Sequence, residues 1–200
     1  MNLVGIVGTN SERSTNRKLL RFMAEHFAPQ AAIEVLEIKD LPAFDEPENK
    51  KAPAAVVAFS KKIAAADGVI IATPEYNHTI PAPLASALEW FAYTSRVLVN
   101  KPVMIVGCSL GALGTSRAQA HLRQILDAPE LKARVMPGTE FFLGHSEHVL
   151  DDDFNLNNPE KVAELEEHFT EFQDFVTITN QIVKQADTDR KKAFVWEAGE

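Results

Sequence analysis

Four short apolar runs, separated by stretches with helical spacing, constrain the fold of this chain more than any other feature of its sequence. The runs cover residues 3–7, 33–38, 68–73 and 103–107. The first and third lack polar alternation, as expected of strands covered on both faces, whereas 33–38 alternates in part and is expected at a sheet edge. Strands that alternate with helices, without tight hairpins, pair in parallel through right-handed crossovers. The pattern therefore predicts a doubly wound α/β sheet with helices on both faces.

The remaining elements extend this pattern. Residues 134–136 together with 141–142 predict a fifth strand. Five helices are expected, at 17–27, from Pro53 to Ile63, through Trp90 and Phe91, from 111–114 to Asp127, and from Pro159 onward, with Ser14 and Asn158 as N-caps of the first and last. The aromatic cluster of Trp90, Phe91 and Tyr93 belongs either to the core or to a subunit interface.

Length and composition favour a single domain. The chain has 200 residues, of which 46% are hydrophobic, which is enough for one sizeable core. We therefore expect one domain at 1–186. The tail at 187–200, with Phe194, Val195 and Trp196 among charged residues, is expected to be either disordered or docked on a partner subunit.

The charge and the cysteine content narrow the class of partner. The net charge is -8 and no basic run stands out, which argues against binding to nucleic acid or to an anionic membrane and favours a small molecule. One cysteine excludes an internal disulfide, and neither a signal peptide nor a long apolar stretch is evident, so a cytoplasmic location is expected. Cys108 is interpreted as a small buried hydrophobe. His145 and His148 are not interpreted as metal ligands, because spacing by three in a loop is a weak signal.

Residues 8–16, between the first strand and the first helix, are typical of a phosphate-binding loop. A strand that leads through a small polar loop into a helix N-terminus brings unpaired backbone N–H groups and the positive end of the helix dipole to one point. Side-chain donors are added by Thr9, Ser11, Arg13, Ser14, Thr15 and Asn16. The alternative is an ordinary strand-to-helix turn with a serine cap.

The loop also restricts the kind of phosphate ligand. A dinucleotide fingerprint needs G-x-G-x-x-G and a P-loop needs G-x-x-x-x-G-K-[ST]. Neither pattern occurs here, since Gly5 and Gly8 are three apart and no Gly-Lys-Ser/Thr is present. One glycine followed by hydroxyls and an amide suits a terminal monophosphate, so a mononucleotide is favoured over NAD or ATP.

Two further loops are expected at the same edge of the sheet, because ligands of doubly wound sheets bind at the carboxyl ends of the strands. The segment 73–81 reads Thr-Pro-Glu-Tyr-Asn-His-Thr-Ile-Pro and offers a carboxylate, a phenol and an amide beside which a planar heteroaromatic ring would lie. The segment 107–114 is glycine-spaced and hydroxylated, which allows backbone N–H groups to approach a ligand closely.

These three segments together resemble the NADPH-dependent FMN reductase family of flavodoxin-like quinone, azo and chromate reductases. The family pattern G-S-x-R-x-x-S-x-N is matched by Gly8, Thr9, Ser14 and Asn16, and T-P-E-Y-N is matched in full at 73–77. The glycine-rich turn is matched through Ser109, Gly111 and Gly114. Two departures are present: Ser11 replaces the usual arginine, and Ala85-Ser86 replaces the usual Lys-Asn.

The resemblance implies a flavodoxin-like five-stranded sheet, FMN as cofactor, NADPH or NADH as co-substrate, and a homodimer or homotetramer. It implies an electron acceptor such as a quinone, an azo compound or free flavin. Thr9, Ser14, Thr15 and Asn16 would hold the FMN phosphate, and Arg13 would supply the charge absent at Ser11 or point to solvent. Pro74, Glu75, Tyr76 and Asn77 would border the isoalloxazine, with Ser109, Gly111 and Gly114 at its pyrimidine edge.

Hydride transfer through a bound flavin needs no side-chain acid or base, so no catalytic residue is expected. Backbone N–H groups of residues 109–114 could stabilise the negative charge of the reduced flavin. Two alternatives stay open: a flavodoxin-like electron carrier without its own NAD(P)H turnover, and a mononucleotide-binding module without redox chemistry.

Overall fold

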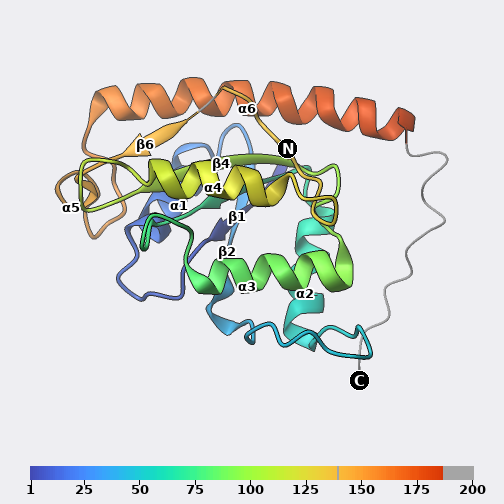
Figure 1. Cartoon of the computed structure of the whole chain (residues 1–200). Helices are drawn as coiled ribbons and strands as arrows, with labels where there is room; N and C mark the ends of the chain where they lie inside the picture. Colours follow the sequence, from blue (N-terminus) through green and yellow to red (C-terminus); the bar gives the residue numbers. More distant parts are fainter. Residues whose placement is uncertain (139, 187–200) are drawn as a thin grey trace.

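A parallel β-sheet forms the centre of the molecule (Figure 1). Its strand order is β2-β1-β3-β4-β5, with β6 also paired to β4. The computed structural model describes residues 1–138 and 140–186. The strands are β1 (Asn2–Val7), β2 (Ala32–Glu37), β3 (Gly68–Ala72), β4 (Pro102–Cys108), β5 (Arg134–Val135) and β6 (Phe141–Leu143). All pairs are parallel. The predicted doubly wound α/β fold is thereby confirmed, and β2 lies at an edge as expected.

The predicted fifth strand is divided into two. β5 pairs with the beginning of β4, at Pro102 and Val103, whereas β6 pairs with its end, at Val106 to Cys108. Between the two, Pro137 lacks a backbone N–H, and Gly138 has a φ of 77° that an extended strand does not adopt. The sheet therefore has six strands where five were predicted.

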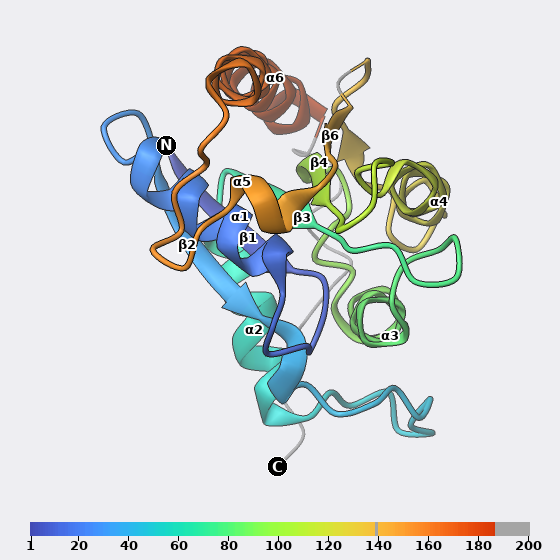
Figure 2. The same cartoon turned by 90° about the vertical axis from the view of Figure 1, so that its left-hand side faces the viewer.

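Helices cover both faces of the sheet, as Figures 1 and 2 show. They are α1 (Thr15–His26), α2 (Ala54–Ala65), α3 (Ala82–Trp90), α4 (Ser116–Leu126), α5 (Ser146–Val149) and α6 (Pro159–Ala186). A 3₁₀ turn, η1 (Ile38–Asp40), follows β2, and a π-helical turn, η2 (Phe91–Ser95), extends α3. The predicted helices are all present, whereas the short α5, η1 and η2 were not predicted.

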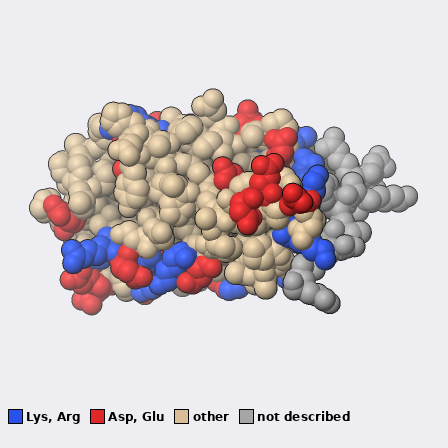
Figure 3. All heavy atoms as spheres, turned by 60° about the horizontal axis from the view of Figure 1, so that its bottom comes forward, with Lys and Arg blue, Asp and Glu red and all other residues tan. Residues whose placement is uncertain are grey.

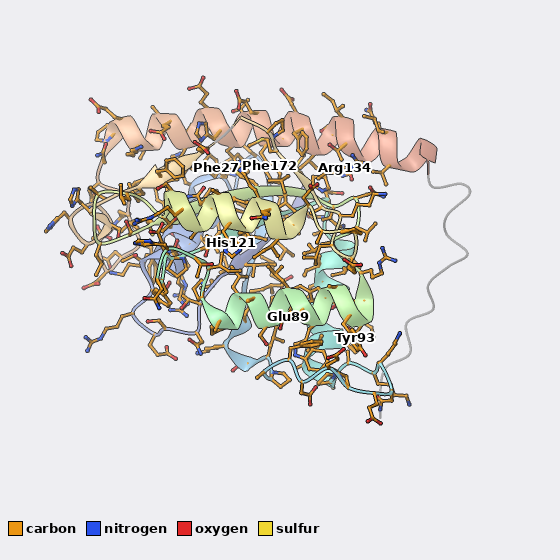
Figure 4. All side chains as sticks on the ribbon, in the orientation of Figure 1. Phe27, Glu89, Tyr93, His121, Arg134 and Phe172 are labelled. Atoms are coloured by element: carbon orange, nitrogen blue, oxygen red, sulfur yellow. The ribbon has the colours of Figure 1, made fainter. Side chains whose placement is uncertain are left out.

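Alternation along the strands divides the core into two layers. Val4 and Ile6 of β1 pack in the cluster that contains α2, α3 and α4. Leu3 and Val7 of the same strand pack in the cluster that contains α1 and α6. Each strand thus serves two apolar layers, which explains why the apolar runs of the sequence lack a polar face. Figure 4 shows Phe27 of the α1 end and Phe172 of α6 between that helix and the sheet.

The aromatic cluster predicted for the core or an interface lies largely in the core. Trp90 and Phe91 are 2% and 0% exposed. The indole N–H of Trp90 donates to the carbonyl of Pro42 at 2.9 Å, and the hydroxyl of Tyr93 lies 3.4 Å from the carbonyl of Pro47 (Figure 4). These contacts fix the 41–53 loop against α3 and η2.

The interpretation of the tail at 187–200 lies outside the described residues. Among the helices that are described, none combines the length and the apolar character needed to cross a membrane. On the face drawn in Figure 3, basic side chains are interleaved with acidic ones, and no wide basic surface is seen there.

Packing of α6 against α1 should dominate the stability of its layer. Phe169 is fully buried and its ring stacks on Phe27 with centroids 3.8 Å apart. Phe169→Ala should lower the free energy of unfolding by about 3 to 5 kcal/mol, because a large cavity is left in the core. Ile178→Ala on the same helix, where Ile178 is 57% exposed, is the control and should change stability by less than about 0.5 kcal/mol. Urea unfolding of both variants measures the difference, and equal losses would contradict this view of the core.

Candidate functional site

The loops after β1, β3 and β4 enclose one cleft of about 430 Å³ at the carboxyl ends of these strands. In the sheet, β1 has β2 as its neighbour on one side and β3 on the other, so the direction of the strand order reverses at β1. The cleft lies at this point, which is the usual ligand position in such sheets. Ten of the thirteen predicted site residues line it: Ser11, Arg13, Ser14, Thr15, Asn16, Pro74, Glu75, Tyr76, Ser109 and Gly111. Cys108 and Leu110 also line it and were not predicted as ligand residues.

The N-terminus of α1 opens into this cleft and carries free donors. Ser14 is the N-cap, since its Oγ accepts from the N–H of Arg17 at 3.2 Å, as predicted. The backbone N–H groups of Thr15 and Asn16 have no partner in the described part of the chain, and the first turn contains no acidic residue. Free N–H groups, the positive end of the helix dipole and the nearby Arg13 fit a phosphate group.

Two predicted phosphate ligands have side chains that are already engaged. Asn16 exchanges two hydrogen bonds with the backbone of Cys108: its Nδ2 donates to the carbonyl at 2.9 Å, and its Oδ1 accepts from the N–H at 3.0 Å. Thr9 is 1% exposed, and its Oγ1 accepts from the N–H of Ser11 at 3.2 Å and lies 3.4 Å from the hydroxyl of Tyr76. These two side chains brace the loops, and Thr9 lies outside the cleft lining.

The loop after β3 contains a tight turn. Tyr76 and Thr79 exchange backbone hydrogen bonds of 3.0 Å, and the two residues between them, Asn77 and His78, have φ angles of 51° and 65°. Positive φ at both central positions is the geometry of a type I′ turn, which asparagine tolerates well. Asn77 is therefore a turn residue that is exposed and lies outside the cleft lining, whereas the half-exposed Tyr76 stands at its rim.

Glu75 locks this loop to α4. Its carboxylate accepts from the backbone N–H groups of Arg117 and Ala118 at 3.1 and 3.3 Å, and from Nε of Arg117 at 2.7 Å. The residue at the N-cap position of α4, Thr115, is left-handed and gives no side-chain cap, so Glu75 supplies the cap from another loop. A second contact joins Thr79 to His121, which Figure 4 labels on α4.

The two glycines of the turn after β4, Gly111 and Gly114, have different roles. Ser109 Oγ donates to the carbonyl of Gly111 at 2.9 Å and accepts from the N–H of Gly114 at 3.0 Å. A Cβ on Gly111 would meet nothing within 4 Å, so a ligand can approach its Cα closely, whereas its carbonyl already accepts from Ser109 and from the N–H of His145. A Cβ on Gly114 would lie 2.6 Å from Cβ of Phe142, and its φ is 54°. Gly114 therefore serves the packing of the turn on β6 and lies outside the cleft lining.

Cys108 has the chemistry of a buried hydrophobe, as predicted. Burial is the main cause that raises the pKa of its thiol to about 12, against weaker opposing effects of Thr15 and Ser146. Because the thiolate is the reactive form, this side chain is no nucleophile at neutral pH.

Comparison with known proteins identifies the family. The family model of NADPH-dependent FMN reductase matches residues 1–148. The chain belongs to this family. The resemblance in the three loops is thereby confirmed, and so are FMN as the cofactor and NAD(P)H as the reductant that characterise this family.

Relatives with known names agree with the family. The chain is 54% identical, over the whole of both chains, to the NADH:(hydroxy)cinnamate reductase subunit CrdA of Vibrio ruber. It is 43% identical to the NADH-dependent flavin reductase subunit 2 of Lactobacillus johnsonii, with 88% of this chain and 97% of that one covered. It is 34% identical to the quinone reductase of Escherichia coli K12, over 76% of this chain and 81% of the relative.

Solved structures support the fold. FerB of Paracoccus denitrificans, a flavoenzyme NAD(P)H:(acceptor) oxidoreductase, superposes with a TM-score of 0.78 at 23% identity, over 89% of this chain and 98% of that one. The flavodoxin-like fold is thus confirmed. As a member of this reductase family the chain is an NAD(P)H-dependent flavin oxidoreductase, which favours the predicted enzyme over the electron carrier.

The two roles of Ser14, helix cap and phosphate donor, can be separated by substitution. Ser14→Asp keeps a cap and should leave the apo protein about as stable, yet abolish FMN binding through charge repulsion and the lost hydroxyl donor, the latter alone being about ten- to a hundredfold. Ser14→Ala should cost about 1 kcal/mol of stability and retain weak FMN binding. Fluorescence titrations with FMN and with riboflavin, which lacks the phosphate, test this. If Ser14→Asp binds FMN tightly, the FMN phosphate does not bind at residues 8–16.

Alkylation tests the state of Cys108. With a pKa of about 12, only about one thiol in 10,000 is ionised at pH 8, so iodoacetamide should hardly modify the folded protein. The rate should rise steadily toward pH 11, without the levelling near pH 9 shown by a free cysteine. The same protein in concentrated urea is the control and should react quickly. Rapid modification of the folded protein at pH 8 would contradict the buried thiol.

Proposed function

We propose that FMN binds in this cleft with its phosphate at the N-terminus of α1, its isoalloxazine along residues 74–76 and its pyrimidine edge at residues 109–111. The observation that carries the proposal is the convergence of free donors on one cleft: the N–H groups of Thr15 and Asn16 at one end and the N–H group of Gly111 at the other, none of which has a partner among the described residues. A volume of about 430 Å³ is in the range of small-molecule sites.

The protein's own contribution is binding, orientation and electrostatics. Bound FMN supplies the redox chemistry, in which a hydride from NAD(P)H is taken up and two electrons pass on to the acceptor. The N–H groups of Leu110 and Gly111 have no partner among the described residues, and they are suited to stabilise negative charge on the reduced ring. Ser109 holds the turn that presents them. No side chain has to act as an acid or a base, so no catalytic residue is proposed.

The electron acceptor is proposed to be a small planar molecule, such as a quinone or a free flavin. The rim of the cleft suits such a molecule, since Tyr76 and Leu110 line it and are 48% and 60% exposed. A homodimer or homotetramer and a cytoplasmic location stay predictions.

A second candidate function is that of one subunit in a two-component reductase. It is favoured by the names of two relatives, from Vibrio ruber and Lactobacillus johnsonii, each of which is called a subunit. In this case the electrons would pass from the bound flavin to a protein partner.

Flavin loading and reduction test the main proposal. The purified protein should take up one FMN per chain, and anaerobic NADH or NADPH should bleach it fully with little semiquinone. Benzoquinone added afterwards should restore the colour. A colourless protein that takes up no FMN would overturn the proposal. A different result would favour the subunit of a two-component system: the nicotinamide bleaches the flavin quickly, but benzoquinone restores the colour no faster than an addition of buffer without quinone.

A further inference from the structure

The phosphate loop is held from behind by a residue that does not line the cleft. Arg17, in the first turn of α1, donates from Nη1 to the carbonyl of Ser11 at 2.7 Å and to that of Glu12 at 3.1 Å. The same stretch contains a turn at residues 12–13 and a hydrogen bond from the Ser11 N–H to the Thr9 hydroxyl. The guanidinium therefore adds two contacts from outside the loop to a stretch that has few of its own.

The two carbonyls determine where the next N–H groups point. In a planar trans peptide, the C=O of one residue and the N–H of the next lie in opposite directions. Because the carbonyls of Ser11 and Glu12 turn toward Arg17, the N–H groups of Glu12 and Arg13 turn away from it. Neither N–H has a partner among residues 1–138 and 140–186. Successive free N–H groups that turn the same way form an anion-binding concavity.

The guanidinium is itself fixed by Glu37, the last residue of β2. Nε and Nη2 of Arg17 reach the two carboxylate oxygens of Glu37 at 2.6 and 2.8 Å, a bidentate pair. The side chains are only 10% and 24% exposed. Glu37 pairs in register with Val7, directly before the loop, so the ion pair joins the loop, α1 and the sheet edge. The hydrogen bond with Glu37 raises the pKa of Arg17 above its ordinary value, so the group stays charged at any pH of interest.

This arrangement shows that Arg17 differs in role from a residue that binds the phosphate directly. Its charge is compensated by Glu37, and it is absent from the cleft lining, where Arg13 is present. Position 11 of the loop is a serine. The guanidinium that contacts the backbone there belongs to Arg17, in the first turn of α1.

We infer that Arg17, held by Glu37, is a positioning residue that presents the N–H group of Arg13, which lines the cleft, to the FMN phosphate. The inference rests on the proposed FMN site and deepens it, since it assigns phosphate recognition to a backbone group that Arg17 orients. Because riboflavin lacks the phosphate, its binding should not depend on how this N–H group is oriented.

The test compares FMN with riboflavin in two variants. Arg17→Lys keeps the charge and can keep the pair with Glu37, but an ammonium lacks the planar fork that holds Glu37 and both carbonyls at once. Arg17→Met removes the charge and keeps much of the volume. Both should weaken FMN binding about tenfold or more, as expected for the loss of charge-assisted contacts, and change riboflavin binding by less than about twofold. Fluorescence titration measures both ligands.

Lys39→Met is the matched control. Lys39 also pairs with the loop, through the Glu12 side chain at 3.3 Å, but touches no backbone carbonyl of it. Its removal should leave the ratio of FMN to riboflavin affinity unchanged, which separates orientation of the backbone from the loss of a nearby positive charge. Thermal melts of the apo proteins accompany the titrations.

The outcomes are distinct. If either Arg17 variant weakens FMN and riboflavin by the same factor, or if Arg17→Lys binds FMN like the parent, Arg17 has only a structural or a charge role and the inference is overturned. An equal effect of Lys39→Met would overturn it as well. If the parent protein itself takes up no FMN, the proposed function fails together with the inference.

Discussion

The arrangement of the cleft depends on the pair of hydrogen bonds between the Asn16 amide and the backbone of Cys108. They join the first turn of α1 to the end of β4, two elements that lie 92 residues apart in the chain. Both Asn16 and Cys108 are buried, so losing either bond would leave an unsatisfied polar group in the interior, at a cost of about 1 to 3 kcal/mol. The amide thereby fixes the distance between the phosphate end of the cleft and the turn at the other end.

The three loops are also braced against one another, which makes the cleft pre-organised. The hydroxyl of Tyr76 meets Thr9 of the first loop, and Glu75 holds α4, which follows the third. Donors that are already oriented need no reorganisation when a charged ligand arrives, and this is the main way in which a protein gains from polar groups at a flavin. The side chains that make these braces belong to the segments that the family pattern matches, and their polar atoms are engaged with other parts of the protein.

The sequence was sufficient for the fold and for the location of the cleft, because both follow from local patterns. Three local patterns can be interpreted without the tertiary structure: the apolar runs of strand length, the Ser14 cap and the Thr-Pro-Glu-Tyr-Asn segment. The division of the fifth strand was missed, although Pro137 and Gly138, which interrupt it, are local signals in the sequence. The roles of Glu75 and Arg17 were missed because their partners, α4 and the end of β2, come from other parts of the chain. Gly111 and Gly114 look alike in sequence, but the structure shows that Gly114 has a positive φ and lies against Phe142, whereas Gly111 does neither.

The cap that Glu75 gives to α4 couples two parts of the molecule. Fraying of the first turn of α4 and displacement of the loop after β3 require the same carboxylate to leave the same N–H groups, so they form one opening event. A ligand that rests on this loop, without touching α4, stabilises the closed form and slows amide hydrogen exchange at the start of α4. Amide exchange at the start of α4 then reports occupancy of the cleft, and a molecule that binds the capped form of α4 more tightly than the frayed form raises the affinity of the cleft for its ligand.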